Sequence, residues 1–435
     1  MVNNKIKEMI VNFWERENFN FFERDFQIPE LEISKVITLV WPRRSGKTSI
    51  CFLKVRKLLE GWIDKKNILY INFEDERLID FTVEDFDNLL KLYFELSWKS
   101  TNDKNIYFFF DEIQNISWWE KFVVRVLNNF NIKIIVTWSS AKMLSKEVDT
   151  ALRWKNISFE ILPLNFQEFL DFKQIKLMKN FEYSIDWNNL YKRTLKEFLT
   201  YWSFPEIVLE KNETIKSWII KTYYDLIFYK DIVDRYSIRD IASLKKFRKI
   251  LTYNFSEYIS LKKVSEQLKV SYQIISNWYE YFQDAYFWFS LKRFSFSLKT
   301  VEKSVAKFYL SDNWFFYSNF WDLNEMNLSR LFENAVFLEF RKLWFVENEN
   351  IYYFKNKKYD IDFILFKKWK IIPIQVCYEL NEQNFDREYT QLEELIEEFN
   401  LKKGYLIIWK NTLDIESNWK IEILNINNII RNFYN

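Results

Sequence analysis

The sequence has no histidine, and this absence narrows the chemistry that the protein can perform. Ser-His-Asp or Cys-His catalysis and histidine-ligated metal sites are excluded, so a general base must be a carboxylate, a lysine or a tyrosine. Cysteine is also rare: Cys51 and Cys377 lie far apart in the chain, which excludes a disulfide framework and favours a reducing compartment. Any bound metal is expected to be a hard cation with oxygen ligands.

Long apolar runs and signal-peptide patterns are absent as well, which predicts a soluble cytoplasmic protein without membrane contact. The 435 residues suggest two or three domains, and 49% of them are apolar, enough for a sizeable core. The net charge is only +2, so charge alone does not indicate nucleic-acid binding.

Glycine is scarce and tryptophan abundant: the chain has 3 glycines and 19 tryptophans, whereas ordinary usage would give about 30 glycines. Because glycine alone tolerates positive φ and close backbone approach, several tryptophans stand where glycine is expected, namely Trp41, Trp118, Trp138, Trp202 and Trp314. We hypothesise that the source organism reads UGA as glycine and that these codons were translated as tryptophan. The alternative is a genuinely tryptophan-rich protein, and the codons themselves distinguish the two.

The strongest motif lies between an apolar strand and an apolar-periodic helix. With glycine at position 41 it has the form G-x-x-x-x-G-K-T, and the expected phosphate-binding residues are Trp41, Pro42, Arg43, Arg44, Ser45, Gly46, Lys47, Thr48 and Ser49. Main-chain N–H groups of such a loop hold phosphate oxygens, Lys47 places its charge near the β- and γ-phosphates, and the Thr48 hydroxyl ligates Mg²⁺. A true indole at position 41 would weaken this interpretation, because it would disturb the loop.

Two carboxylates, Asp111 and Glu112, end a predicted buried strand. Many strands end in acids, so this pattern alone is weak. It becomes strong beside a phosphate loop, because the carboxyl ends of neighbouring parallel strands meet in one crevice. There Asp111 is expected to hold Mg²⁺, and Glu112 to act as the general base that polarises the attacking water.

Weaker candidates follow the next strand. Ser139 could sense the γ-phosphate or orient water, but an ordinary turn with capping serines explains residues 137–140 equally well. Arg153 is a candidate arginine finger from this subunit or a neighbour, although a solvated surface arginine is the simpler interpretation. Arg43 and Arg44 either touch phosphate or are exposed loop charges.

Short apolar runs alternate with amphipathic stretches over the first 163 residues, which predicts an α/β fold with a parallel sheet. Strands are expected at 36–40, 68–73, 106–110, 132–137 and 158–162, and helices at 49–59 and 119–129. Residues 165–240 have helical spacing, and a helix–turn–helix pattern occupies 261–283. A second α/β region is predicted by strands at 307–310, 351–354, 361–366, 370–377 and 405–409 and by a helix at 382–399.

Taken together, these motifs resemble the AAA-type ATPases of bacteria and archaea that carry a C-terminal domain of unknown function. The resemblance rests on residues 40–48, 71–75, 110–115, 137–140 and 204–206, and it extends to 228–233 and 331–336. It implies a P-loop ATPase core at 1–163, a helical lid at 164–245, a winged-helix segment at 246–300 and a C-terminal domain similar to PD-(D/E)xK nucleases at 301–435. It also implies ATP and Mg²⁺ as cofactors, and glycine at Trp41, Trp118, Trp138, Trp154, Trp202 and Trp314.

The nuclease-like region departs from the catalytic pattern of such enzymes. Glu333 and Asp362 are candidates for the first acid, but Gln375 stands where the second acid belongs and Cys377 where a lysine belongs. A neutral amide binds Mg²⁺ poorly and a thiol cannot replace a cationic lysine, so nuclease activity is not expected. Glu379 is only a weak substitute for the missing acid.

The sequence does not decide which partners other than ATP the protein binds. Lys262, Lys263, Lys269 and Tyr272 could meet DNA phosphates, but residues 271–283 carry few basic side chains, and winged helices also bind proteins. The alternative function is therefore a nucleic-acid-binding regulatory module that uses ATP as a binding switch. A protein partner or a homo-oligomer is equally compatible with the sequence.

Overall fold

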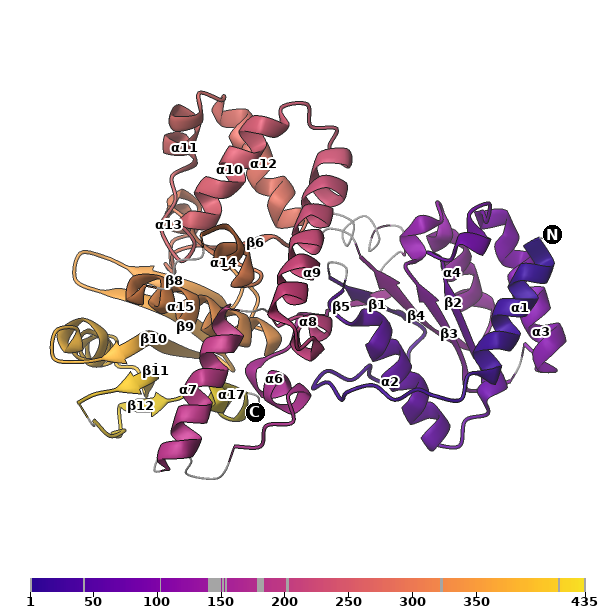
Figure 1. The fold of residues 1–435 in the computed structure, drawn as a ribbon, viewed down its shortest axis with the longest axis horizontal. Helices are drawn as coiled ribbons and strands as arrows, with labels where there is room; N and C mark the ends of the chain where they lie inside the picture. Colours follow the sequence, from indigo (N-terminus) through magenta and orange to yellow (C-terminus); the bar gives the residue numbers. More distant parts are fainter. Residues whose placement is uncertain are drawn as a thin grey trace. The chain divides into compact units, whose positions relative to one another are not determined.

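The computed structural model describes residues 2–41, 44–101, 103–139, 150, 152, 155–177, 184–200, 203–320, 324–413 and 415–433. The chain divides into two compact units, Met1–Pro163 and Leu164–Asn435. Each unit has its own sheet and its own covering helices (Figure 1). No helix in the described part of the chain is both long enough and apolar enough to cross a membrane.

The first unit is built on a five-stranded parallel sheet. Its strands have the spatial order β2-β3-β4-β1-β5 and are β1 (Val36–Val40), β2 (Ile68–Asn72), β3 (Ile106–Asp111), β4 (Ile132–Trp138) and β5 (Asn156–Glu160). β1 and β3 are buried along their whole length, as continuous apolar runs are when helices cover both faces of a sheet. The order places the carboxyl end of β1 next to that of β4, and the end of β3 next to both β4 and β2.

Helices cover both faces of this sheet and are α1 (Val2–Glu15), α2 (Lys47–Glu60), α3 (Phe86–Ser97) and α4 (Trp119–Asn129) (Figure 1). On one face, alternate strand residues such as Phe108 and Val136 pack with Phe86 and Phe122, whose rings stack with centroids 4.3 Å apart. On the other face, Tyr70 of β2 packs against α2. Burial of each large apolar side chain contributes about 1.5–3 kcal/mol to the stability of the fold. Packing on both faces of the sheet therefore holds the strand ends in place.

The second unit begins with helices. They are α6 (Phe166–Phe172), α7 (Ile185–Thr200), α8 (Pro205–Leu209), α9 (Glu213–Leu226), a π-helix (Ile227–Asp234), α10 (Ile241–Tyr253), α11 (Leu261–Leu268) and α12 (Tyr272–Asp284). Side chains mark where several of them start: Asn165, Asn212, Asp240 and Ser271 each accept a hydrogen bond from a main-chain N–H of the first turn. β6 (Trp288–Leu291) and β7 (Lys307–Leu310) then form an antiparallel pair. In the sequence, α13 (Leu298–Lys303) lies between these two strands, and so does the predicted domain boundary at 300/301.

A mixed five-stranded sheet ends the chain, in the order β12-β11-β10-β9-β8. Its strands are β8 (Ile351–Lys355), β9 (Asp360–Lys367), β10 (Lys370–Leu380), β11 (Gly404–Asn411) and β12 (Ile421–Leu424). The pairs β8/β9 and β9/β10 are antiparallel, and the pairs β10/β11 and β11/β12 are parallel. The helices of this region are α14 (Trp314–Phe320), α15 (Glu325–Lys342), a π-helix (Asp386–Thr390), α16 (Gln391–Glu398) and α17 (Ile429–Phe433).

Some predicted boundaries were wrong. The strand predicted at 158–162 runs from Asn156 to Glu160, because it is a half-buried edge strand and its pairing with β1, not its apolar content, sets its limits. The helix predicted at 382–399 consists of the π-helix and α16. β6 and β12 were not predicted, although β7, which is also four residues long, was predicted with its observed bounds.

Candidate functional site

The loop between β1 and α2 is where the sequence predicts phosphate binding. Arg44 (φ 71°) and Gly46 (φ 98°) have a left-handed backbone, which glycine adopts without strain. Gly46 stands directly before Lys47, the first residue of α2, and offers no side chain to cap that helix. The first N–H groups of α2 are therefore suited to an anionic ligand.

Two side chains of the first turn of α2 face inward from this loop. Lys47 is buried, and its Nζ donates to the main-chain oxygen of Trp41 at 2.7 Å. Thr48 Oγ1 donates to Oδ2 of Asp111 at 2.7 Å. The loop motif and the carboxylate at the end of β3, which are 63 residues apart in sequence, thus meet at one point.

Asp111 is buried and is held by three hydroxyl groups. Besides Thr48, Tyr70 donates to Oδ2 at 2.8 Å and Thr137 donates to Oδ1. Burial raises the pKa of Asp111, the charge of Glu112 raises it further, and the hydroxyl donors oppose this shift. A buried carboxylate whose donors are all neutral is stabilised by a cation placed beside it.

Glu112 has a left-handed backbone (φ 51°) and is 8% exposed. Both of its carboxylate oxygens are held: Ser139 Oγ donates to Oε1, and Gln114 Nε2 donates to Oε2 at 2.5 Å. Its main-chain N–H donates to Thr137 Oγ1 at 2.9 Å. The structure therefore brings Ser139 to Glu112, and Thr137 orients the two acids together.

Three residues of this site were missed from the sequence: Arg24, Tyr70 and Gln114. Arg24 is 7% exposed and donates to the carbonyl oxygens of Ser45 (3.2 Å) and Leu162 (2.8 Å), so it ties the loop to the chain that follows β5. Gln114 lies within residues 110–115, which carry the resemblance, but no role was predicted for it, and Arg24 and Tyr70 belong to no motif. The one available signal is a lone tyrosine within the aliphatic strand β2.

The remaining predicted residues are placed as follows. Ser45 is buried, Ser49 is half-buried in the first turn of α2, and Arg44 is exposed. Pro42, Arg43 and Arg153, like Trp154 and Trp202, lie outside the described residues. The roles predicted for them stay predictions.

Two kinds of tryptophan among the described residues bear on the glycine hypothesis. Trp62, Trp98, Trp118, Trp344 and Trp369 have left-handed backbone with φ between 60° and 67°, and the side chains of Trp62, Trp98 and Trp369 are 95%, 88% and 104% exposed. A residue with a side chain pays roughly 1–2 kcal/mol for this conformation, and an exposed indole gains nothing in return. By contrast, Trp41, Trp138 and Trp314 are buried and lack positive φ.

A second buried cluster lies in the second unit. Lys307 Nζ is 2.6 Å from Glu333 Oε1 and 3.1 Å from Asp362 Oδ1, and Tyr309 donates to Glu333 Oε1 at 2.6 Å. Burial alone would lower the pKa of Lys307, but the charges around it, Glu333 first, outweigh burial and raise it well above its usual value. Nearby, Gln375 donates to Oε2 of Glu388 at 2.7 Å. The ammonium group of Lys307 thus lies between Glu333 and Asp362, the two candidates for the first acid of the nuclease-like pattern.

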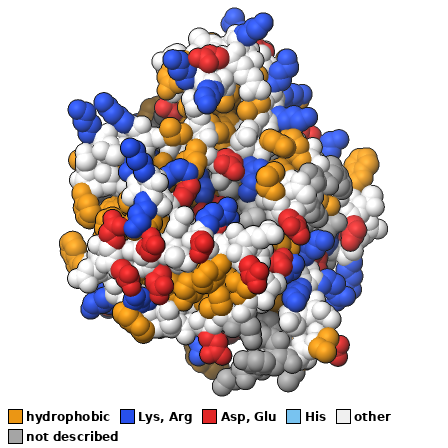
Figure 2. Space-filling view, turned by 90° about the vertical axis from the view of Figure 1, so that its left-hand side faces the viewer, with side chains coloured by type: hydrophobic (Ala, Val, Ile, Leu, Met, Phe, Trp, Pro, Cys, Tyr) orange, Lys and Arg blue, Asp and Glu red, His pale blue; other side chains and the backbone are white. Residues whose placement is uncertain are grey.

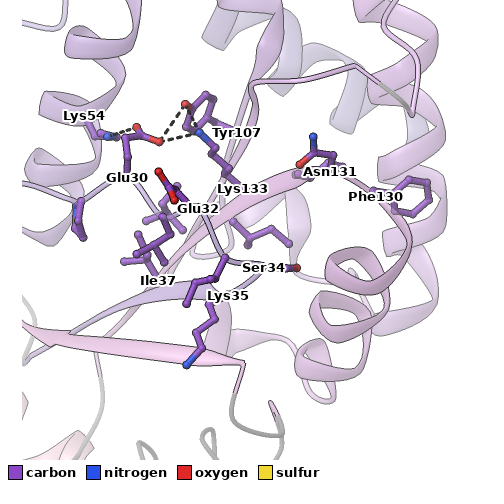
Figure 3. A pocket seen from close by; sticks show the side chains of 16 residues that line it. Glu30, Glu32, Ser34, Lys35, Ile37, Lys54, Tyr107, Phe130, Asn131 and Lys133 are labelled. Carbon is purple, nitrogen blue, oxygen red and sulfur yellow. Dashed lines mark hydrogen bonds and ion pairs between the residues drawn. The ribbon is translucent and has the colours of Figure 1, made fainter.

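A cavity of about 490 Å³ lies at the opposite ends of the strands, where β1 and β4 begin (Figure 3). Glu30 projects into it and contacts Lys54, Lys133 (2.8 Å) and Tyr107 (3.3 Å). Burial opposes ionisation of Glu30, but the two lysines lower its pKa. Because ligands of open α/β sheets bind at the carboxyl ends of the strands, this cavity is not the predicted phosphate site.

Comparison with known proteins gives two family matches and several relatives. Residues 34–170 match an AAA domain, and residues 192–317 match a domain of unknown function. An uncharacterised protein of Methanocaldococcus jannaschii is 43% identical over 384 residues, which cover 87% of this chain and 82% of that protein. The chain belongs to the family of this archaeal protein. An uncharacterised protein of Haemophilus influenzae is 28% identical over 85% of this chain and 88% of its own length.

The AAA domain accounts for the parallel sheet and the β1–α2 loop of the first unit, which has a P-loop fold. Among solved structures, the Aeropyrum pernix ORC1 protein in complex with DNA gives a TM-score of 0.29 at 12% identity, covering 72% of this chain and 88% of its own. AMPPCP-bound DnaA from Aquifex aeolicus gives 0.26 at 13% identity, covering 64% and 85%. Scores this low carry no argument about the activity or partners of this chain.

Proposed function

We propose that the AAA domain binds ATP with Mg²⁺ at the β1–α2 loop and hydrolyses it. The observation that carries the proposal is the 2.7 Å hydrogen bond between Thr48 and Asp111, which joins the phosphate-loop motif to the strand-end carboxylate. A Mg²⁺ ion bound with nucleotide typically takes one or two protein oxygens and completes its shell with phosphate and water. The hydroxyl of Thr48 and the carboxylate of Asp111 fit that demand. Bound Mg²⁺ would neutralise charge on the phosphates.

The other residues of the site have separate tasks in this proposal. When ATP binds, the ammonium group of Lys47 gives up its hydrogen bond to the carbonyl oxygen of Trp41 and donates to phosphate oxygens instead. There its charge stabilises the negative charge of the phosphoryl group that is transferred. Glu112 accepts the proton of the attacking water. Ser139 and Gln114 hold its two oxygens and so set the direction in which the carboxylate accepts. Arg153 is proposed as the arginine finger, from the same chain or from a second copy.

We also propose that the left-handed tryptophans stand for glycine. Five tryptophans with positive φ support this interpretation, because a side chain disfavours that backbone conformation and glycine adopts it freely. At Trp41 the reading rests on the loop motif instead, since that residue has no positive φ. The codons of the gene test this proposal: UGA is expected at positions 41, 62, 98, 118, 344 and 369, and UGG at these positions would reject it.

The test of the ATPase proposal is the substitution Lys47→Ala, in protein that carries glycine at those positions. Loss of a charged phosphate contact is expected to weaken binding of a fluorescent ATP analogue roughly ten- to hundredfold and to abolish phosphate release. Lys57→Ala, on the same helix but in its last turn, is the matched control and should change neither. Unchanged affinity and turnover in Lys47→Ala would reject the assignment. Tight binding without turnover in the parent protein would favour a nucleotide-dependent binding switch.

A further inference from the structure

A large cavity in the second unit is lined by residues of α11, α13 and β8 and has a volume of about 940 Å³. Five of its lining side chains are cations: Lys263, Arg293, Lys299, Lys303 and Lys355. The other lining residues are serines, a threonine, tyrosines and Val305, and none is acidic. This composition is unusual for a chain whose net charge is only +2.

Most of these cations have no counter-ion in the part of the chain that the structure describes. Among the described residues only Lys355 of the five forms an ion pair, with Asp360. Lysines elsewhere in the unit are commonly paired, as Lys410 is with Glu379 at 3.1 Å. The Nε of Arg293 is buried without a hydrogen-bond partner. Like charges that face one cavity repel one another, so a bound polyanion would remove this repulsion and satisfy the guanidinium group.

We propose that this cavity binds the phosphodiester backbone of a nucleic-acid strand. Lysine, arginine, serine, threonine and tyrosine are the side chains that contact phosphate oxygens in nucleic-acid complexes, and they make up this lining almost completely. The cations come from three separate elements, and Lys263, Lys299 and Lys303 are exposed at its rim. Lysine and arginine side chains prevail in the upper part of the space-filling view, and basic and acidic side chains are mixed in the lower part (Figure 2).

The cavity differs from the DNA contact expected of a helix–turn–helix. Of the four residues that the sequence suggested for DNA contact, only Lys263 lines the cavity, whereas Lys262, Lys269 and Tyr272 do not. The binding surface therefore uses α11 and α13 and does not depend on α12 reading a groove. Contacts to phosphate carry no sequence information, so binding is expected to be nearly independent of base sequence.

The experiment measures fluorescence anisotropy of labelled single- and double-stranded oligonucleotides of about 20 nucleotides, longer than a single-module site, with the full chain over a series of salt concentrations. The test variant is Lys263→Gln/Lys299→Gln/Lys303→Gln. Its affinity at low salt should fall on the order of tenfold or more, and the slope of log K against log salt should flatten by about 3, roughly 1 for each lost lysine. The control is Lys221→Gln/Lys246→Gln/Lys402→Gln, which removes the same charge from exposed positions outside both the cavity and the helix–turn–helix.

Each outcome decides the proposal. Equal losses in the test and control variants, or no loss in either, would overturn it. Saturable binding of polyglutamate or of tripolyphosphate that displaces the oligonucleotide from the cavity would overturn it in favour of an acidic polypeptide or a small polyphosphate. Lys47→Ala should bind the oligonucleotide as the parent does, so failure of the ATPase proposal and failure of this one are distinguishable.

Discussion

Each unit of the protein contains a pair of carboxylates with little solvent exposure, and the two pairs differ in the charge beside them: Asp111 and Glu112 are buried, and the side chains of Glu333 and Asp362 are each 14% exposed. In the AAA domain, Asp111 and Glu112 accept hydrogen bonds from neutral donors, and neither forms an ion pair among the described residues. In the second unit, Glu333 and Asp362 share the ammonium group of Lys307 at 2.6 Å and 3.1 Å. An aspartate and a glutamate therefore lie beside a cationic side chain in one unit and beside neutral donors alone in the other.

The difference shows how a site for a cation can be told from a structural ion pair. A buried carboxylate without a cation is costly, and burial is the main reason why the pKa of Asp111 is raised. If ATP and Mg²⁺ bind as proposed, the metal would remove that cost, and part of the binding energy would come from the site itself. Burial raises the pKa of Glu333 as well, but there the ammonium group of Lys307 already supplies a positive charge that opposes the shift, whereas Asp111 has only hydroxyl donors. Four substitutions test this distinction.

The largest effect is expected from Glu112→Gln. If Glu112 is the general base, turnover should fall by about 10²–10⁴-fold while nucleotide affinity is retained, since the amide keeps the shape of the side chain but cannot accept the proton. Phosphate-release assays and nucleotide titrations measure the two quantities. Glu84→Gln, an exposed position of the same unit, serves as the control. Normal turnover in Glu112→Gln would remove its role as base.

The next largest effect is expected on stability, from Lys307→Met. Removing one partner of a buried ion pair leaves uncompensated charge and should lower the free energy of unfolding by about 3–5 kcal/mol, as measured by chemical denaturation. The double variant Lys307→Met/Glu333→Gln should recover part of this loss, because the amide carries no charge. Little destabilisation in the single variant would mean that the second cluster is not held together by its ammonium group.

The loss of stability in Lys307→Met is expected to depend on pH. Burial raises the pKa of Glu333 to about 7, while Lys307 opposes that shift. A carboxyl group whose pKa is raised in the folded state contributes stability at acid pH and loses it as the pH rises through that pKa. Without Lys307 the pKa rises further, so the deficit of Lys307→Met relative to the parent should be larger near pH 8 than near pH 6. A deficit that shrinks with rising pH would contradict the assignment.

The sequence predicts the AAA domain well because its signals are local. Continuous apolar runs locate β1 to β4 to within a residue or two, and the loop, Lys47, Thr48 and Asp111 follow from spacing along the chain. The supporting residues do not follow, because Arg24 and Tyr70 reach the site only through tertiary packing. Lys307 is the clearest case: it stands in a predicted strand, but only the fold reveals that its ammonium group lies between two distant acids.

The smallest effects are expected from a matched pair of tyrosine substitutions, Tyr70→Phe and Tyr309→Phe. Each removes one hydroxyl donor from a buried carboxylate, with oxygen distances of 2.8 Å and 2.6 Å, and leaves the ring in place. Each should cost about 1 kcal/mol, but in a different quantity. Tyr70→Phe should shift the Mg²⁺ dependence of turnover about fivefold, because Asp111 loses a donor that orients it toward the metal. Tyr309→Phe should lower stability and leave the Mg²⁺ dependence unchanged. If both variants changed stability alone, Asp111 would have to be regarded as a structural carboxylate like Glu333, and the contrast between the two clusters would disappear.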